Sequence, residues 1–177
     1  MNINEYQNYH ETKAHTSAEF PYNTYLCSIP LDFPGVPLHW HDELELVVIK
    51  RGQGFVSVDF DKRLVHSGDI IIIPPGCLHA IEQDDTFKME YENIIFKPDL
   101  LSSGANDLCM IQYIVPLLDG SLPIEYFLTP ALGSFEALSN CIRQIDLVCA
   151  DQTPGWQLAV KSSLFNFFFL LISKKKK

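Results

Sequence analysis

The sequence predicts a mainly β fold followed by C-terminal α-helices, and two observations lead to this prediction. Between residues 19 and 96, short apolar runs are separated by glycine, proline and aspartate, a pattern typical of strands joined by turns. From Pro98 onward, apolar residues recur at steps of three and four, which is the period of an α-helix. With 177 residues, the chain is long enough for one domain with a helical extension.

The predicted strands follow one another closely. Residues 44–49 are apolar on both faces, as expected of a strand that is covered on both sides. We expect the Gly52-Gln53-Gly54 stretch to turn the chain into a strand over 55–60, and Asp61-Lys62 to form a second turn. The four isoleucines of 70–73 indicate a buried strand.

A further strand is predicted over residues 88–96. It places Met89, Tyr91, Asn93 and Ile95 on one face, because alternate side chains of a strand point the same way.

Three helical segments are predicted in the second half. The first covers 108–118 and is ended or kinked by Pro116. The second is amphipathic, and its apolar face consists of Phe135, Leu138, Ile142, Ile145 and Cys149. The third has Thr153 as N-cap and Pro154 in its first turn, and after residue 163 it is apolar nearly all round.

The most informative stretches are 35–52 and 68–79. In a strand, residues two or four apart share a face, so His39, His41 and Glu45 are expected to project together. A turn forced by Pro74-Pro75-Gly76 would bring His79 to the same place. Three imidazoles and one carboxylate suit a divalent transition metal such as Zn, Ni, Fe or Mn. The same residues could also line a pocket without any metal.

The order and spacing of these residues resemble the two sequence motifs of the cupin superfamily, whose fold is a small antiparallel β-barrel, a double-stranded β-helix. The residues that match the motifs are His39, His41, Glu45, Gly52, Gly68, Pro74, Gly76 and His79. Gly35 lies closer to the first histidine than in the usual pattern, and Gln83 stands where asparagine is usual. Neither position is a metal ligand in the family, so the resemblance implies an intact ligand set.

The net charge of −9 argues against a nucleic-acid-binding surface on this chain, since holding phosphates requires clustered Lys and Arg. The terminal run Lys174–Lys177 is interpreted as a solvated tail. We therefore expect no specific binding to duplex DNA by this chain alone.

The five cysteines are widely spaced and include no C-x-x-C motif, which favours reduced thiols in a cytoplasmic protein. The first 18 residues are polar and lack the apolar stretch of a secretory signal. The apolar run 164–172 is too short for a membrane span, which needs about 20 residues. No membrane partner is expected.

A cupin barrel followed by helices resembles the N-terminal sensing and dimerising domain of AraC-type bacterial transcription regulators. The resemblance implies a polar arm over 1–18, a cupin barrel over 19–97 and a helical dimerisation segment over 98–177 that leads to a linker. It also implies that a small effector, a sugar or small acid, binds in the barrel, and that a separate helix-turn-helix domain, which this chain lacks, contacts DNA. We interpret the chain as the sensor part of a longer regulator.

Within this interpretation, the effector pocket is predicted to contain His39, His41, Glu45, His79 and Tyr91. Core packing is an equally good reading for Tyr91. The remaining histidines, His10, His15 and His66, have no partners at a recognisable spacing and are expected at the surface. Asp42 has the wrong parity for the site, and Glu43 is expected at a solvated turn.

The last helix is expected to pair two copies of the chain into a homodimer, because only one of its apolar faces can pack on its own protein. The predicted interface residues are Leu164, Phe165, Phe168, Leu171 and Ile172. Two other function classes stay open: a small metal-dependent cupin enzyme, an isomerase or dioxygenase, and a stand-alone carbohydrate-binding cupin.

Overall fold

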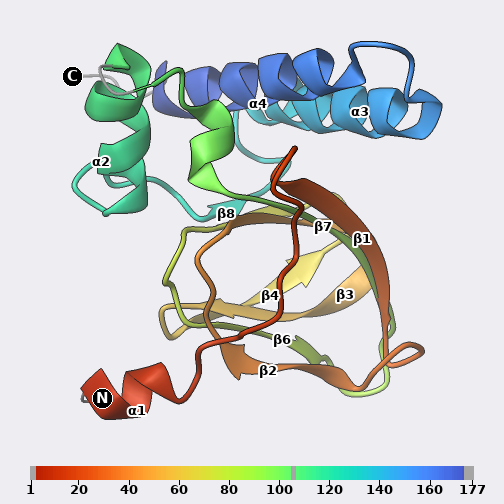
Figure 1. Cartoon of the computed structure of the whole chain (residues 1–177). Coiled ribbons are helices and arrows are strands. Elements are labelled where there is room, and N and C mark those ends of the chain that lie inside the picture. The colour runs from red at the N-terminus through yellow and green to blue at the C-terminus, as the bar shows by residue number, and fades with distance from the viewer. Residues whose placement is uncertain (1–2, 105–106, 174–177) are drawn as a thin grey trace. The chain divides into compact units, whose positions relative to one another are not determined.

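A computed structural model describes residues 3–104 and 107–173. The chain divides into two compact units, Met1–Lys97 and Pro98–Lys177. The first unit is an antiparallel β-barrel and the second is helical (Figure 1). The predicted fold class, a cupin-like β-barrel followed by C-terminal helices, is confirmed.

The described part of the first unit, residues 3–97, contains one short helix and seven strands, and all the strand pairs within it are antiparallel. The elements are α1 Ile3–Gln7, β1 Tyr22–Ile29, β2 Gly35–His39, β3 Leu44–Val58, β4 Asp61–His66, β5 Ile70–Ile73, β6 His79–Gln83 and β7 Met89–Phe96. The four isoleucines of β5 are buried, as the sequence indicates.

Strand β3 is the element that both sheets of the barrel share. Its first part pairs with β5 and β7, and its last part pairs with β4 and β6. The predicted turn at Gly52–Gly54 is therefore wrong, because the strand continues through it. Gly52 has φ +79°, and a Cβ there would lie 1.8 Å from the carbonyl oxygen of Lys88. The glycine permits a close approach of two backbone segments at the point where β3 changes partners.

The turn between β3 and β4 lies two residues earlier than predicted. Asp59 and Phe60 both have positive φ, 48° and 71°, and Val58 pairs with Asp61 across the two-residue turn. Such a turn matches the twist of the flanking strands. Phe60 is consequently 70% exposed, although the sequence placed it inside the strand with Val56 and Val58.

The N-terminal segment is fixed to the barrel through Trp40. The indole lies between the rings of Tyr6 and His10, with ring centroids 4.6 and 4.1 Å away. The backbone N–H of Trp40 donates to the carbonyl of Tyr9, and the N–H of Glu11 donates to the carbonyl of Trp40. Figure 1 shows this segment crossing the barrel after α1. The predicted polar arm thus contributes to the structure of the first unit.

The second unit contains two long helices after several short elements. The elements are η1 Pro98–Leu101, η2 Met110–Ile114, α2 Val115–Leu118, β8 Phe127–Leu128, α3 Phe135–Asp151 and α4 Trp156–Ser173. Element η2 is a π-helix that continues directly into α2. Pro116 does not end the helical segment at once, because α2 continues to Leu118; the segment changes from the π-helix to the α-helix directly before the proline.

Helices α3 and α4 pack against each other. Gln152 ends α3 in the left-handed conformation. Helix α4 begins at Trp156, whose N–H donates to the carbonyl of Thr153, so Thr153 and Pro154 lie in the preceding turn and not at the predicted N-cap and first turn. By length and composition alone α4 could cross a membrane, but a core helix of a soluble protein passes the same test.

Candidate functional site

Three histidines meet in the barrel. His39 ends β2, and His79 begins β6 as its cross-strand partner. His41 lies in the loop between β2 and β3, so the predicted single strand through these residues is interrupted, yet its side chain joins the other two. One ligand atom from each imidazole lies within 4.8 Å of the others, and among the described residues this is the one such group of His, Cys, Asp or Glu side chains.

Backbone carbonyls fix the orientation of all three rings. The Nδ1 atoms of His39, His41 and His79 lie 2.9, 3.2 and 2.9 Å from the carbonyl oxygens of Pro37, Glu43 and Cys77 respectively. A carbonyl oxygen accepts and never donates, so each Nδ1 carries a proton and Nε2 is the nitrogen available to a metal ion.

The carboxylate of Glu45 on β3 lies close to two of these imidazoles. Its Oε2 atom lies 3.0 Å from His41 Nε2 and 3.4 Å from His79 Nε2. Burial alone would raise the pKa of Glu45, but the hydrogen bonds and charges of His41 and His79 hold it well below its usual range. Burial opposes the charge on His41, and the bonded Glu45 with Glu43 and Glu11 raises its pKa above the ordinary value. Both shifts favour the charged forms of this buried pair, whose Nε2 and Oε2 atoms lie 3.0 Å apart.

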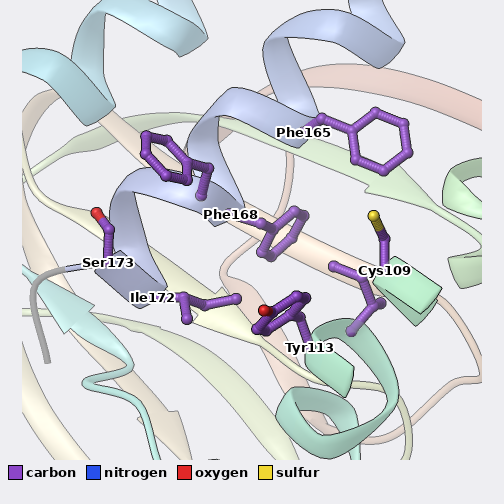
Figure 2. A pocket seen from close by; sticks show the side chains of 8 residues that line it. Cys109, Tyr113, Phe165, Phe168, Ile172 and Ser173 are labelled. Carbon is purple, nitrogen blue, oxygen red and sulfur yellow. The ribbon is translucent and has the colours of Figure 1, made fainter. Parts of the chain in front are cut away.

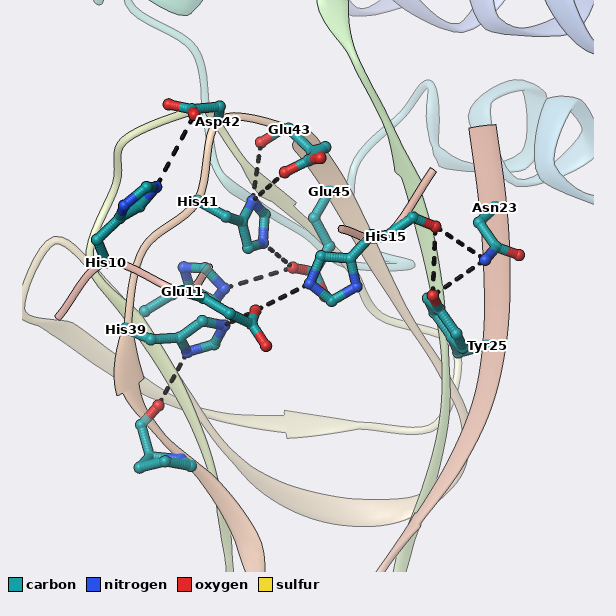
Figure 3. Close-up of polar contacts among 12 residues, drawn as sticks. His10, Glu11, His15, Asn23, Tyr25, His39, His41, Asp42, Glu43 and Glu45 are labelled. Carbon is teal, nitrogen blue, oxygen red and sulfur yellow. Dashed lines mark hydrogen bonds and ion pairs between the residues drawn. The ribbon is translucent and has the colours of Figure 1, made fainter. Parts of the chain in front are cut away.

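Glu43 does not occupy the solvated turn that the sequence suggested. It is 6% exposed, and one carboxylate oxygen lies 3.7 Å from His41 Nδ1. Its neighbour Asp42 is exposed and points away from the imidazoles toward His10, as Figure 3 shows. Asp42 thus lies outside the site, as predicted. The prediction that Glu43 lies at a solvated turn is wrong.

Two further polar side chains come from the N-terminal segment. Glu11 Oε2 lies 2.9 Å from His15 Nε2 and 3.5 Å from His39 Nε2, and Figure 3 shows its carboxylate between the two rings. Burial favours the neutral acid, but His15, and then His39 and His41, lower the pKa of Glu11. Burial and the charge of His79 lower the pKa of His39.

The prediction of a surface position is therefore wrong for His15, whose side chain is 10% exposed, whereas His66 is exposed as expected. His10 is half-buried against Trp40. The spacing of Glu11 and His15 was visible in the sequence, but nothing there indicated that the segment returns to the barrel.

These side chains line a cavity of about 370 Å³. It contains all five predicted pocket residues, together with others from the N-terminal segment, β1, β2, β6 and β7. The lining is Glu11, Lys13, His15, Tyr25, Cys27, Phe33, Gly35, Val36, Pro37, His39, His41, Glu45, His79, Ile81, Tyr91, Asn93 and Ile95.

Several buried polar atoms of this lining lack a hydrogen-bond partner. His15 Nδ1 and Asn93 Oδ1 have no hydrogen-bond partner within the described residues. The Tyr91 hydroxyl likewise has no hydrogen-bond partner of good geometry within the described residues, and burial raises the pKa of Tyr91 and of the Cys27 thiol that interacts with it. An unpaired buried polar atom costs about 1–3 kcal/mol, so this arrangement suits a polar guest.

The donor set also fits a divalent transition metal. Imidazole nitrogens and a carboxylate oxygen are typical ligands of Zn, Ni, Fe and Mn, and the carbonyl-bound Nδ1 atoms supply the outer hydrogen bonds that usually orient histidine ligands. The compact group comprises His39, His41 and His79, with Glu45 hydrogen-bonded to His41 and 3.4 Å from His79 Nε2.

Comparison with known proteins assigns the chain to a family. A family profile described as an AraC-like ligand binding domain matches residues 25–168. The chain belongs to the AraC-like ligand-binding domain family. The recognition made from the motifs is thereby confirmed, and the matched range spans both units of this AraC-like domain.

Individual relatives agree with this assignment. An uncharacterized HTH-type transcriptional regulator of Bacillus subtilis strain 168, YdeC, is 33% identical over 159 residues, covering 89% of this chain and 54% of the relative. The HTH-type transcriptional activator RhaR of Mannheimia succiniciproducens is 32% identical over 69 residues, covering 39% of this chain and 24% of the relative. The AraC-like domain thus spans about half or less of the length of these curated relatives.

Among solved structures, a cupin protein from Bacteroides fragilis is 24% identical, with a TM-score of 0.42 over 50% of this chain and 80% of that chain.

The helical unit of this AraC-like domain has a separate apolar groove of about 450 Å³ (Figure 2). It is lined by Cys109, Tyr113, Ile114, Phe165, Phe168, Phe169, Ile172 and Ser173. Of the predicted interface residues, Leu164 and Phe168 are buried within the chain and are thus unavailable to a partner. Phe165, Leu171 and Ile172 are half-buried. The exposed large residues of α4 are Leu158 and Phe169, at 74% and 64%.

Proposed function

We propose that this chain is the ligand-sensing and dimerisation domain of an AraC-type transcription regulator in the cytoplasm, and that it binds a small effector, a sugar or small acid, in the barrel. The observation that carries the proposal is the 370 Å³ cavity with its partly unpaired polar lining, in a chain that belongs to the AraC-like ligand-binding family. A polar guest would give hydrogen-bond partners to His15, Tyr91 and Asn93.

Regulation in this proposal is a population shift. The effector favours one arrangement of the sensor and of a DNA-binding domain outside this chain, by no more than its differential affinity for the two arrangements. DNA is a partner only through that second domain, because this chain carries a net charge of −9.

The proposal includes a divalent transition metal in the site. His39, His41 and His79 would hold it through Nε2, with Glu45 as the carboxylate ligand. When bound, the metal would act as a Lewis acid that orients an oxygen atom of the effector. The residues themselves orient one another through the carbonyl bonds of Nδ1.

The proposed homodimer uses the outer face of α4. Leu158, Phe165, Phe169 and Ile172 follow one another at steps of seven, four and three, so they form one stripe along the helix. The buried residues Val160, Leu164, Phe167 and Phe168 occupy the other side. A second copy of the chain is the partner that would cover the stripe with twofold symmetry.

The experiment that tests the effector proposal is a thermal-shift screen with neutral sugars and small carboxylic acids. A ligand at one hundred times its Kd stabilises the native state by about 2.7 kcal/mol, which raises the melting temperature by several degrees. The shift should persist in His66→Ala, an exposed control, and disappear in the cavity variant His15→Ala. A panel without any shift in the unmodified chain argues against an effector of these classes.

The His triad specifically favours one alternative, a metal-dependent cupin isomerase or dioxygenase. This reading predicts metal-dependent consumption of a sugar or acid by the unmodified chain, and loss of turnover in His41→Ala. Binding without turnover favours the sensor. A stand-alone carbohydrate-binding cupin would show sugar binding without a covalently linked DNA-binding domain.

A further inference from the structure

The carboxylate of Glu11 occupies a place in the cavity where an external anion could bind. It lies 2.9 Å from His15 Nε2 and 3.5 Å from His39 Nε2. The other cavity carboxylate, Glu45, is hydrogen-bonded to His41 and lies 3.4 Å from His79 Nε2. Each carboxylate therefore has its own pair of imidazoles, and His15 with His39 is the pair nearer the N-terminal segment (Figure 3).

The backbone holds Glu11 at this position from outside the barrel. Its N–H donates to the carbonyl of Trp40 at 2.9 Å. Farther along, the carbonyl of His15 accepts from Asn23 Nδ2 at 2.9 Å. The Glu11 carboxylate is thus carried by the N-terminal segment, which contacts the barrel through Trp40 and Asn23, whereas Glu45 lies within the long strand β3.

The cavity lining also contains a cation, Lys13. The Lys13 ammonium lies 5.3 Å from the ring centroid of Tyr25, and both residues line the cavity. Lys13 supplies a positive charge to a cavity whose protein has a net charge of −9, and His15 adds a ring nitrogen that contacts a carboxylate, so this part of the cavity favours an anion. Charge-assisted hydrogen bonds to a carboxylate are about twice as strong as neutral ones, so this part discriminates acids from sugars.

We propose, building on the proposed effector-sensing function, that the effector is a small carboxylic acid and that Glu11 is an internal carboxylate occupying the position of the effector's own carboxylate. The effector displaces the Glu11 side chain from His15 and His39. Its other polar groups then reach Asn93 and the Tyr91 hydroxyl, which have unpaired capacity. The apparent affinity then equals the intrinsic affinity multiplied by the fraction of molecules in which Glu11 has left the site free.

The direct test uses acetate as the probe on residues 1–177 carrying Glu11→Ala. Acetate should fill the freed position, raise the melting temperature in a saturable manner, and shift the ring NMR signals of His15 and His39. Acetamide, which has the same shape without the charge, should do neither. Glu19→Ala is the matched control, since Glu19 is an exposed acid of the same segment. Absence of an acetate effect in Glu11→Ala, or an equal effect in Glu19→Ala, overturns the proposal.

Glu11→Gln provides a second variant that keeps the size of the side chain. If Glu11 occupies the site in nine molecules of ten, its neutralisation lowers the Kd for an acid found in the effector screen by about tenfold. The Kd for a neutral sugar should not fall. A rise in the acid's Kd would show that Glu11 binds the effector directly and would refute the internal-carboxylate role.

The two proposals fail in distinguishable ways. Saturable acetate binding by Glu11→Ala, together with an effector screen that finds nothing for the unmodified chain, supports the internal carboxylate and counts against effector sensing. Tight binding of a neutral sugar by the unmodified chain, weakened in Glu11→Ala, supports effector sensing and overturns the acid class.

Discussion

The orientation of individual histidines depends on backbone carbonyls that come from different parts of the barrel. Pro37 belongs to β2, Glu43 to the loop before β3, and Cys77 to the loop before β6. Because these carbonyls are fixed by the fold, each imidazole keeps its Nδ1 proton and presents Nε2. This preorganisation is what a metal ion or a polar effector would use.

The metal component of the site gives a prediction at this scale. If a metal is bound, elemental analysis of protein purified without a histidine tag should find about one transition-metal ion per chain. The combination of His41→Ala with Glu45→Gln should reduce this to background, since it removes one imidazole and the charge of the carboxylate.

His66→Ala is the matched control for the metal measurement, because His66 is exposed and lies outside the cavity. It should retain the full metal content. Undiminished metal in the double variant, with circular dichroism showing a folded protein, would exclude His41 and Glu45 as ligands.

At the level of the elements, β3 holds the barrel together because it pairs with four other strands along its length. The exchange of partners takes place near Gly52, where the register with β7 shifts between Ile49 and Arg51. A side chain cannot be accommodated there, since the carbonyl of Lys88 fills the space where a Cβ would project.

We predict that Gly52→Ala lowers the free energy of unfolding by more than about 2 kcal/mol, because it adds a backbone clash to an unfavourable positive φ. Gly120→Ala separates the two effects: Gly120 also has a positive φ, 77°, but nothing lies within 4 Å of its would-be Cβ. It should cost about 1 kcal/mol. Urea denaturation measures both, and equal losses would rule out the clash as the main cause.

The elements show where sequence reasoning succeeds. Strong periodic signals, such as the isoleucines of β5 and the apolar face of α3, predicted both the elements and their burial. The glycines at 52 and 54 led to the wrong prediction of a turn. In a sequence, a glycine that permits a turn cannot be told from a glycine that permits the close approach of two backbone segments. The cupin motifs located His39, His41, Glu45 and His79, since their spacing reflects strand and turn geometry.

The sequence did not locate Glu11 and His15. Their place in the cavity depends on long-range contacts, the stacking of Tyr6 and His10 on Trp40 and the backbone bonds at Trp40, which leave no local periodic pattern. Glu43 was missed for a similar reason: its burial follows from the loop path between β2 and β3 and not from strand parity.

At the scale of the whole molecule, two surface properties bear on its partners: the acidic net charge bears on contacts with DNA, and the apolar stripe of α4 bears on association with a second chain. The net charge of −9 disfavours phosphate contacts. The stripe of Leu158, Phe165, Phe169 and Ile172 favours association, since fully burying each large apolar side chain contributes about 1.5–3 kcal/mol. Substituting the buried Phe168 would not test this surface, because a charge there would disrupt the core.

The exposed positions of the stripe provide the sharper test of the homodimer. Sedimentation equilibrium of the unmodified chain at micromolar concentration should give twice the 20.1 kDa of one chain. Leu158→Glu combined with Phe169→Glu should give a folded monomer, because two charges cannot be buried unpaired in the contact. Leu26→Glu, at a position that is 77% exposed on β1, should leave the dimer intact. If the unmodified chain sediments as a monomer, the homodimer proposal is wrong. The apolar stripe of α4 would then need a different partner to cover it.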